Sequence, residues 1–243
     1  MKISVIIPMY NEASIIEDTA KTLYEYMSGR FEDWELLFSD DGSSDGCGDL
    51  VRKLDLPNVR VVGYEKNHGK GCAVRTAMLE ACGDIRMFTD ADLAYGTEVI
   101  GRVYDTFAEN TDADIVIGSR NISSDGYEGY TFIRKLASKC YMIVLRVVAG
   151  FKMSDSQCGF KVYTNDAAKK IFSEIETDGF AFDIEAIMTA NSMGMSIGEM
   201  PVKIINHRES KINVLSDSIK MFRDLLRIKK RVKQRAKARN AKN

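Results

Sequence analysis

The sequence lacks the features that mark secreted, disulfide-stabilised or membrane-spanning proteins. Its five cysteines are scattered, and no two form a Cys-x-x-Cys pair, so neither a disulfide framework nor a zinc site is indicated. No apolar run reaches the ~18 residues of a membrane span, and the longest, residues 140–151, contains Arg146. Residues 1–2 lead directly into a strand-like run without a signal-peptide pattern. These absences favour a reducing, cytoplasmic location.

The net charge of −1 conceals an uneven distribution of charge along the chain. Residues 221–243 contain ten lysines and arginines and one acid, Asp224, which gives this tail a charge of +9 and the preceding residues −10. A basic tail on an acidic body predicts a polyanionic partner. Anionic lipid is favoured over nucleic acid because no aromatic side chains are interleaved with the basic ones. A disordered, solvated tail is the alternative.

The length and composition fit a single α/β domain. With 243 residues, of which 45% are hydrophobic, the chain can bury a core of ordinary size. Ile3–Pro8 is a continuous run of largely apolar, β-branched residues, which is typical of a central parallel strand buried on both faces. Asn11 is expected to cap the following helix, whose core positions recur at Ile15, Ile16, Thr19, Leu23 and Met27.

Strand-like and helix-like segments then alternate along the chain. Strands are expected at residues 34–39, 59–64, 85–88 and 113–118, and helices at about 72–82 and 99–107. This order predicts a mainly parallel central sheet flanked by helices, with right-handed crossovers. We expect a catalytic domain at residues 1–220 and a basic helical tail at 221–243.

Two carboxylates, Asp90 and Asp92, follow the strand at residues 85–88. In an extended chain, residues i and i+2 lie on the same side, so these carboxylates can converge. Their mutual repulsion would raise their pKa values, and a Mg²⁺ or Mn²⁺ ion would remove it while binding substrate phosphates. The alternative is that Asp90 caps the next turn and Asp92 is solvated.

Other strands also end in stretches suited to ligand binding. Residues 40–45 (DDGSSD) can accept hydrogen bonds from a base or a ribose, although a plain turn would have the same composition. Residues 66–71 combine glycines, a helix N-terminus that favours anions, and Lys70, which can contact a phosphate. The stretches after Pro8, Ser39 and Phe88 would share one sheet edge, which predicts a single nucleotide-plus-metal site.

These motifs resemble the nucleotide-sugar half of inverting family 2 glycosyltransferases, which have the Rossmann-like GT-A fold. The resemblance rests on residues 8–12 (PMYNE), 40–45 and 90–92 (DAD). Residues 118–120 (GSR), 155–161 (DSQCGFK), 180–185 (FAFDIE) and 210–211 (SK) are narrower motifs. They resemble the polyprenyl-phosphate branch, which includes the dolichyl-phosphate mannose and glucose synthases. The motif QCGFK looks closer to the glucosyl members.

The resemblance implies roles at the donor end of the site. Asp40 or Asp41 would bind the base edge, Asp90 would face the ribose and donor sugar, and Asp92 would ligate the metal, with Asp90 beside it. The rest of the nucleotide-sugar pocket would be formed by Pro8, Tyr10, Glu12, Lys70 and Ala91. Many mannosyl relatives have a glutamine at the metal where this chain has Ala94, so its metal shell would contain more water.

At the acceptor end, the resemblance implies that Arg120 and Arg134 hold the acceptor phosphate. Gln157, Arg208, Ser210 and Lys211 would complete this part of the site. Residues 131–151 form a largely apolar helical pattern that would pack in the core or lie on the bilayer and present Arg134. Many relatives have an aromatic residue in the segment that here reads NHRE, residues 206–209. At this segment the chain departs from the acceptor-binding pattern of those relatives.

The predicted chemistry depends on the acceptor. A metal at Asp92 would stabilise the charge that develops on the leaving phosphate. A lipid phosphate is already anionic, so it would need positioning by arginines and no strong base. A sugar hydroxyl would need a carboxylate base, for which Asp183, Glu185 and Asp155 are candidates. Capping or ion pairing is the alternative role of these carboxylates, and surface solvation that of the arginines.

We therefore expect a metal-dependent hexosyltransferase at the cytoplasmic face of a membrane. Its donor would be UDP-glucose, or alternatively GDP-mannose, and its acceptor a polyprenyl phosphate such as dolichyl or undecaprenyl phosphate. The alternatives are a transferase acting on a glycan or polysaccharide hydroxyl and a non-catalytic nucleotide-sugar-binding protein. No nucleic acid partner is expected, while a homo-oligomer or a small membrane partner is left open by the sequence.

Overall fold

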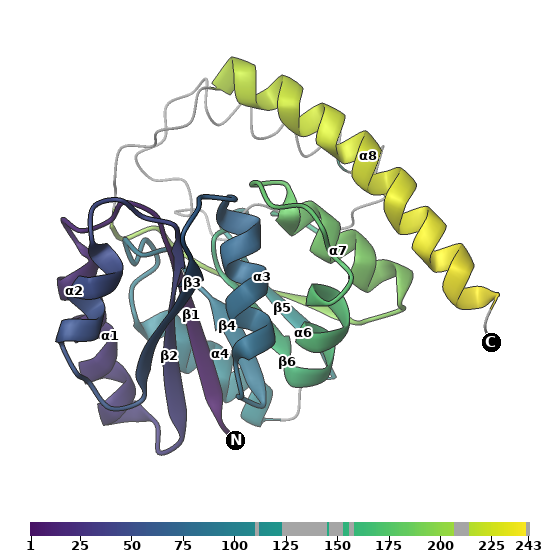
Figure 1. Ribbon diagram of the computed structural model, residues 1–243. Helices are drawn as coiled ribbons and strands as arrows, with labels where there is room; N and C mark the ends of the chain where they lie inside the picture. The colour runs from purple at the N-terminus through teal and green to yellow at the C-terminus, as the bar shows by residue number, and fades with distance from the viewer. Residues whose placement is uncertain (110–111, 123–144, 146–152, 156–157, 207–213, 242–243) are drawn as a thin grey trace.

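The computed structural model describes residues 1–109, 112–122, 145, 153–155, 158–206 and 214–241, with side chains only from residue 223 in the last range. Within these residues, seven strands form one sheet in the order β3-β2-β1-β4-β6-β5-β7 (Figure 1). The strands are β1 (Ile3–Met9), β2 (Trp34–Asp41), β3 (Val59–Tyr64), β4 (Ile85–Phe88), β5 (Ile115–Ser119), β6 (Lys161–Thr164) and β7 (Ile197–Pro201). Strand β6 is antiparallel to β4 and β5, and the other pairs are parallel.

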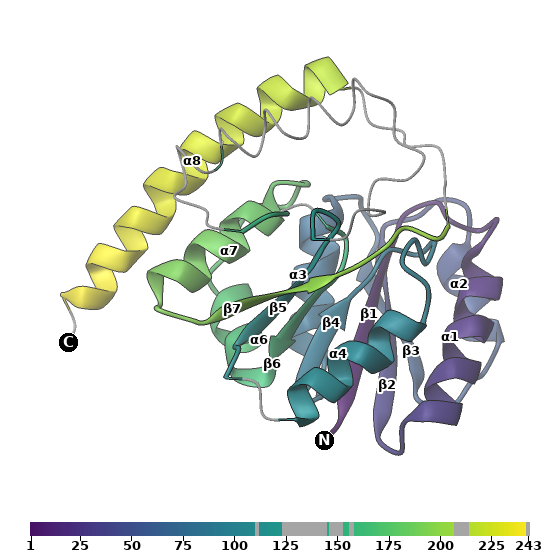
Figure 2. The same ribbon diagram turned by 180° about the vertical axis from the view of Figure 1, so that it is seen from behind.

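Helices cover both faces of this sheet (Figure 2). They are α1 (Ile16–Arg30), α2 (Cys47–Lys53), α3 (Lys70–Glu80), α4 (Glu98–Ala108), α6 (Asn165–Phe172), α7 (Phe182–Ser192) and α8 (Val214–Asn240). Side chains of α1, α2 and α4 belong to one buried apolar cluster, and those of α3, α6, α7 and α8 to another. In β1, Ile7 belongs to the first cluster and Ile6 to the second, which explains its continuous apolar sequence.

The predicted elements agree with the structure in most places. The strands expected at 59–64 and 85–88 have those bounds, and the expected strand at 34–39 continues to Asp41. The predicted cap was wrong, because α1 begins at Ile16 rather than next to Asn11. Asn11 has a φ of 53°, donates its N–H to Ser43 Oγ at 3.0 Å and accepts the Ser44 N–H at 2.9 Å. It therefore joins the ends of β1 and β2.

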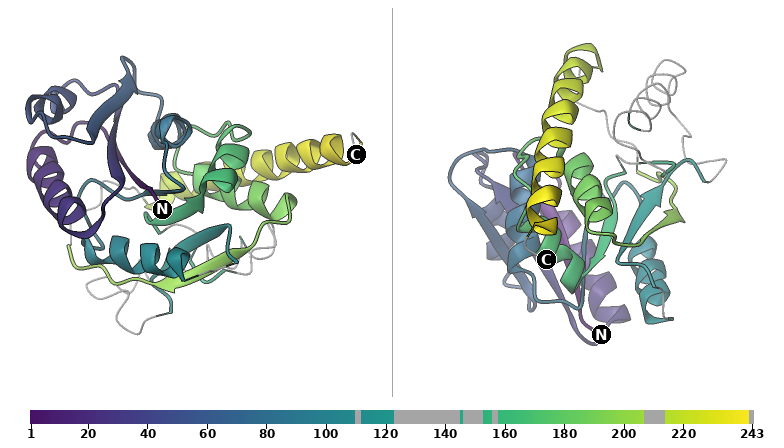
Figure 3. Two further views of the ribbon diagram at one scale, coloured as in Figure 1. Left: turned by 90° about the horizontal axis from the view of Figure 1, so that it is seen from below. Right: turned by 90° about the vertical axis from the view of Figure 1, so that its right-hand side faces the viewer.

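Helix α8 runs along α7 and is fastened to it on one side (Figures 1 and 3). Leu225, Ile228 and Val232 are buried in the apolar cluster shared with α7. The boundary that we expect between residues 220 and 221 falls inside this helix, and the division into two domains stays a prediction. Within the described residues, no helix is long and apolar enough to cross a membrane.

Arg231, Arg235 and Arg239, which we call the arginine ladder, lie four residues apart on the side of α8 that meets α7. Arg235 and Arg231 contact the buried Glu185 Oε1 at 2.9 and 3.2 Å, and Arg239 contacts Glu174 Oε2 at 2.5 Å. Glu185 also accepts the backbone N–H groups of residues 176 and 177 at 3.1 and 2.8 Å. Burial alone would raise the pKa of Glu185, but hydrogen bonds from Thr177 and the charge of Arg231 outweigh it and lower the pKa.

Replacing Glu185 should therefore destabilise the protein. Glu185→Gln leaves two arginine side chains without their buried carboxylate, and we expect a loss of about 2–3 kcal/mol, or a fall in Tm of roughly 5–10 °C. Because the pKa is lowered on folding, this carboxylate stabilises the protein above its usual pKa of 4.5, and its contribution is lost as the pH falls through the lower folded-state value. Thermal unfolding from pH 7 down to pH 3 measures both effects.

The matched control is Asp166→Asn, which removes one partner of an exposed ion pair with Lys170. Exposed pairs contribute little, so we expect a change of less than about 0.5 kcal/mol. An equal effect of the two variants at pH 7 would contradict a structural role for the arginine ladder.

Candidate active site

The carboxyl ends of β2, β1 and β4 are neighbours in the sheet, as the shared-edge argument predicted. The register pairs Met9 with Asp40 across β1 and β2, and Ile6 with Phe88 across β1 and β4. The loops that follow Met9, Asp41 and Phe88 therefore leave the sheet side by side. Tyr10 is 46% exposed at this edge, while Pro8 and Glu12 are half-buried.

Asp45 joins the loops that follow β1 and β2. Its carboxylate accepts the backbone N–H groups of Ala13 at 2.8 Å and Cys47 at 3.1 Å. Desolvation would raise the pKa of Asp45, but these two hydrogen bonds outweigh it and lower the pKa. Asp45 therefore holds two loops together and is committed to backbone contacts.

The two carboxylates at the end of β2 have different environments. Asp41 is 3% exposed and accepts hydrogen bonds from the Tyr64 hydroxyl at 2.7 Å, the Asn67 amide at 2.9 Å and the backbone N–H groups of residues 68 and 69. It therefore orders the loop before α3. Asp40 is half-buried and accepts the Ser43 N–H at 2.9 Å. Of the two predicted base-binding residues, the geometry favours Asp40.

Two lysine–carboxylate pairs surround the ring of Phe88, and we call these four side chains the charge quartet: Lys70, Asp90, Lys161 and Asp183. Lys70 at the start of α3 pairs with Asp90. Lys161 on β6 is fully buried, pairs with Asp183 at 3.0 Å and donates to the Cys158 carbonyl at 2.7 Å. The Nζ atoms of Lys70 and Lys161 lie 6.0 and 5.5 Å from the centroid of the Phe88 ring.

The charges of the quartet act on one another. Burial alone would lower the pKa of Lys70, but the charges of Asp90, Asp183 and Asp92 outweigh it and raise the pKa. Burial raises the pKa of Asp183, although Lys161 and Lys70 oppose that shift. Lys70 is therefore held as a cation among three carboxylates, at the place where the sequence predicts a phosphate contact.

One expected anion site is already filled by the chain itself. The N–H groups of Gly71 and Cys72, in the first turn of α3, both donate to the Asp178 carbonyl, at 2.7 and 3.2 Å. Arg75 of the same helix also contacts the Asp178 carboxylate at 2.8 Å. The prediction that this helix N-terminus would attract a phosphate was therefore wrong for these two N–H groups, while Lys70 stays available to the site.

The Asp92 loop is fastened to residues 205–206, which follow β7. The Ile205 N–H donates to the Ala94 carbonyl at 2.8 Å, and the Asn206 amide donates to the Leu93 carbonyl at 3.0 Å. Asp92 Oδ1 accepts the Ala94 N–H at 3.1 Å. The buried Ala91 contributes its carbonyl, which accepts the Thr19 hydroxyl at 2.7 Å.

Asp90 and Asp92 suit a divalent ion that also binds a substrate diphosphate. Both offer carboxylate oxygens, which Mg²⁺ and Mn²⁺ prefer. In the part of the chain that the structure describes, no third histidine, cysteine or carboxylate completes a metal cluster. Mg²⁺ is commonly held by one or two carboxylates together with substrate phosphates, so this donor set fits such an ion.

Arg120 is positioned at the end of β5 by a buried carboxylate. Its Nε and Nη2 atoms donate to Asp155 at 2.7 and 3.0 Å, and the two side chains are 12% and 4% exposed. Burial alone would raise the pKa of Asp155, but Arg120 outweighs it and lowers the pKa. Glu199 holds the backbone at this point, because its Oε1 accepts the Ser154 N–H at 2.9 Å, the Ser154 hydroxyl at 2.6 Å and the Asp155 N–H at 3.4 Å.

All three carboxylates that are candidates for a general base have cationic partners. Asp155 is paired with Arg120, Asp183 with Lys161, and Glu185 with the arginine ladder. The other predicted acceptor residues, Arg134, Gln157, Arg208, Ser210 and Lys211, lie outside the described residues, as does most of the expected helix at 131–151.

Sequence reasoning gave no role to several residues that shape the site. A Cβ atom at Gly159 would collide with the Asp90 carboxylate, so a glycine is needed there. The Gly159 N–H donates to the Tyr95 hydroxyl at 3.3 Å. The motif QCGFK marked this region, but neither spacing nor periodicity could indicate that Gly159 packs on Asp90 or that Lys161 pairs with Asp183.

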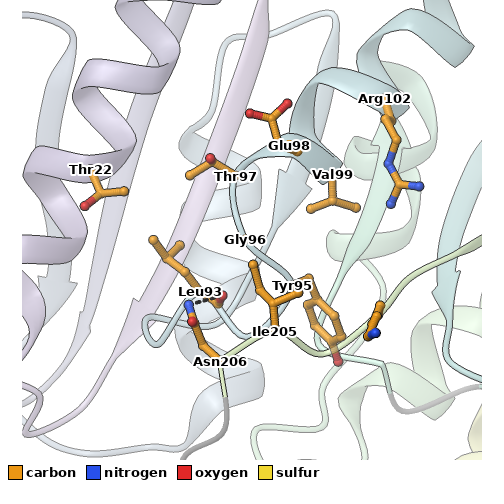
Figure 4. A pocket seen from close by; sticks show the side chains of 11 residues that line it. Thr22, Leu93, Tyr95, Gly96, Thr97, Glu98, Val99, Arg102, Ile205 and Asn206 are labelled. Atoms are coloured by element: carbon orange, nitrogen blue, oxygen red, sulfur yellow. Dashed lines mark hydrogen bonds between the residues drawn. The ribbon is translucent and has the colours of Figure 1, made fainter. Parts of the chain in front are cut away.

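A groove of about 480 Å³ is lined by residues of the Asp92 loop, of α4 and of the segment after β7 (Figure 4). Leu93, Tyr95, Val99 and Ile205 give it a largely apolar wall, and neither Asp90 nor Asp92 lines it. The two carboxylates are therefore not part of the groove wall.

The fold and the site define a class of protein, the sugar transferases of the GT-A fold. Residues 4–172, more than half of the chain, match the family described as Glycosyl transferase family 2. The chain therefore belongs to glycosyl transferase family 2, as the motifs predicted. Among solved structures, glucosyl-3-phosphoglycerate synthase from Mycobacterium tuberculosis in complex with Mn²⁺, UDP-glucose and phosphoglyceric acid has a TM-score of 0.69 at 20% identity, covering 95% of this chain and 79% of that one. This likeness confirms the predicted fold.

Curated relatives carry the name that the narrower motifs suggested. A dolichyl-phosphate beta-glucosyltransferase from Dictyostelium discoideum is 32% identical over 240 residues, which cover 93% of this chain and 73% of that protein. A dolichyl-phosphate beta-glucosyltransferase from Saccharomyces cerevisiae is 29% identical over 249 residues, which cover 93% and 74%. The resemblance to the polyprenyl-phosphate branch is confirmed.

Gly159→Ala tests the close packing on Asp90. The added methyl group must displace the Asp90 carboxylate from Lys70, and a displacement of about 1 Å in a catalytic site can cost about a hundredfold in rate. We expect a loss of that order in transferase activity and weaker binding of a nucleoside diphosphate, measured by calorimetry. The control is Gly179→Ala, because no atom lies within 4 Å of a Cβ there. Equal activity of the two variants would contradict the packing argument.

Proposed function

We propose that this chain transfers glucose from UDP-glucose to a polyprenyl phosphate, with inversion at the anomeric carbon and with the help of Mg²⁺ or Mn²⁺. The observation that carries the proposal is the state of Asp155, Asp183 and Glu185. Each is ion-paired, so none is free to deprotonate a sugar hydroxyl. A phosphate acceptor needs no such base, because its attacking oxygen already carries negative charge. The names of the curated relatives support the same acceptor and sugar.

The donor would lie across the carboxyl ends of β2, β1 and β4. Tyr10 would contact the base, and Asp40 would accept a hydrogen bond from its edge. Lys70 would supply a positive charge to the diphosphate in exchange for its contact with Asp90. Asp92, with Asp90 beside it, would hold a divalent ion, which supplies Lewis-acid stabilisation of the leaving diphosphate. The Mn²⁺ and UDP-glucose named with the mycobacterial neighbour support this donor and metal.

The acceptor phosphate would be held by Arg120, together with Arg134. Asp155 fixes the plane of the Arg120 guanidinium through two hydrogen bonds, so little rotational freedom is lost on binding an anion. Two anions, the acceptor phosphate and the donor diphosphate, must approach each other, and the fixed cations Arg120 and Lys70 make that approach favourable. A polyprenyl chain resides in a bilayer, so the enzyme would act at a membrane surface, on its cytoplasmic face.

The proposal is tested by transfer of labelled sugar to polyprenyl phosphate in detergent. We expect labelled lipid from UDP-glucose, little from GDP-mannose, and none after chelation of divalent ions, with recovery on addition of Mn²⁺. Asp92→Asn should lower the rate by about a hundredfold or more, because one donor to the ion is weakened. Asp49→Asn, an exposed change on α2, is the matched control and should retain wild-type activity.

Each contrary outcome identifies a different error. Labelled lipid from GDP-mannose alone would contradict the donor assignment. Transfer only to a glycan hydroxyl would contradict the phosphate acceptor. Tight binding of nucleotide without turnover on any acceptor would contradict catalysis by the chain alone.

A further inference from the structure

The basic residues of the last turns of α8 divide by type between its two sides. From residue 229 to 239, the arginines are those of the arginine ladder, which points to α7 and to the acidic residues Glu174, Glu176 and Glu185. The lysines, Lys229, Lys230, Lys233 and Lys237, are all exposed. We call these four residues the lysine face. The charge of the tail therefore consists of an inner part that is neutralised by the protein and an outer part that faces solvent.

This division follows the chemistry of the two side chains. Guanidinium groups form fixed, multidentate contacts with carboxylates, which suits buried ion pairs. Ammonium groups on flexible stems act as hydrated point charges, which suits a surface of laterally mobile anions. None of the four lysines forms an ion pair with a residue that the structure describes, so their charge is available to a partner.

We propose that the lysine face docks this enzyme on the anionic headgroups of a bilayer. The neighbouring turns extend the same outer side with Arg223 and Arg227, and Leu226 between them is 49% exposed. Cations flanking an exposed apolar side chain form the pattern of a helix that lies on a bilayer surface. Figures 1 and 2 show that α8 begins beyond the sheet edge that carries the site. The inference rests on the proposed function, because the proposed acceptor is a lipid of the membrane.

Nucleic acid fits this surface less well. Proteins that bind single strands use aromatic side chains as stacking platforms, and residues 223–241 contain no phenylalanine, tyrosine or tryptophan. Binding of nucleic acid in place of vesicles would therefore contradict the proposal.

The inner side of α8 determines which variants can test the outer side. The arginine ladder pairs with Glu185, whose carboxylate accepts the backbone N–H groups of residues 176 and 177. The backbone carbonyl of the next residue, Asp178, caps α3 just after Lys70. Deleting the end of α8 would remove the lysine face and disturb the donor site together. Point variants of the lysines separate the two effects, since these side chains lie outside the site.

The experiment compares two triple variants of the full chain that each remove three positive charges. The first is Lys229→Gln/Lys230→Gln/Lys233→Gln on the lysine face. The second is Lys21→Gln/Lys53→Gln/Lys169→Gln, which changes exposed lysines elsewhere on the body. Binding is measured by co-sedimentation with phosphatidylcholine vesicles, with and without phosphatidylserine, at low salt. A lysine near an anionic surface contributes about fivefold in affinity, so the first variant should lose at least about tenfold and the second less than about twofold.

Other measurements on the same proteins keep the interpretation clear. Both variants should have wild-type Tm values and should transfer sugar normally to a short-chain prenyl phosphate in detergent. Vesicle binding that is unchanged in the lysine-face variant, or equally reduced in both variants, would overturn the proposal. A wild-type protein that binds a DNA duplex at the same salt but does not bind vesicles would also overturn the proposal, if the lysine-face variant loses the DNA binding. Failure of sugar transfer alone would count against the proposed function, because vesicle binding does not require turnover.

Discussion

Lys70 and Lys161 each place an ammonium group beside the ring of Phe88, and each pairs with a carboxylate that needs a cation. Without Lys161, Asp183 would be a buried charge next to Asp90. Without Lys70, Asp90 would lose the cation with which it is paired. This balance lets several carboxylates share one sheet edge. A diphosphate and a divalent ion that bound together would nearly cancel each other's charge, so the charge balance of the site would be kept.

The same balance extends beyond the site through the segment between α6 and α7. In residues 174–178, the side chains of Glu174 and Glu176 bind the arginine ladder of α8, and the backbone carbonyl of Asp178 caps α3. Helix α8 is therefore part of the framework that positions Lys70, and its lysines face away from that framework. One side of α8 packs against the rest of the protein, and the other side faces solvent. Contact of the solvent side with a membrane surface would therefore leave the geometry of the site unchanged.

The sequence predicted the sheet edge better than the contacts on it. Largely apolar runs located β1, β2 and β4 because strands buried on both faces have little freedom in composition. The two short strands β6 and β7 were missed, since each has only four or five residues and β6 breaks the parallel order. Asn11 and the start of α3 were misjudged because their polar groups are satisfied by Ser43, Ser44 and Asp178, which are distant in sequence. The roles of Gly159 and Lys161 depend on such tertiary contacts, which local patterns do not contain.

The central claim is that this site serves an acceptor that is already anionic. The most direct test compares farnesyl phosphate with farnesol as acceptors for UDP-glucose, at equal concentration and with the same metal. Because the three candidate bases Asp155, Asp183 and Glu185 are all ion-paired, we predict transfer to the phosphate and at least about a hundredfold slower transfer to the alcohol. Comparable rates with the two acceptors would contradict the account, since a hydroxyl could then be activated by a group in the site.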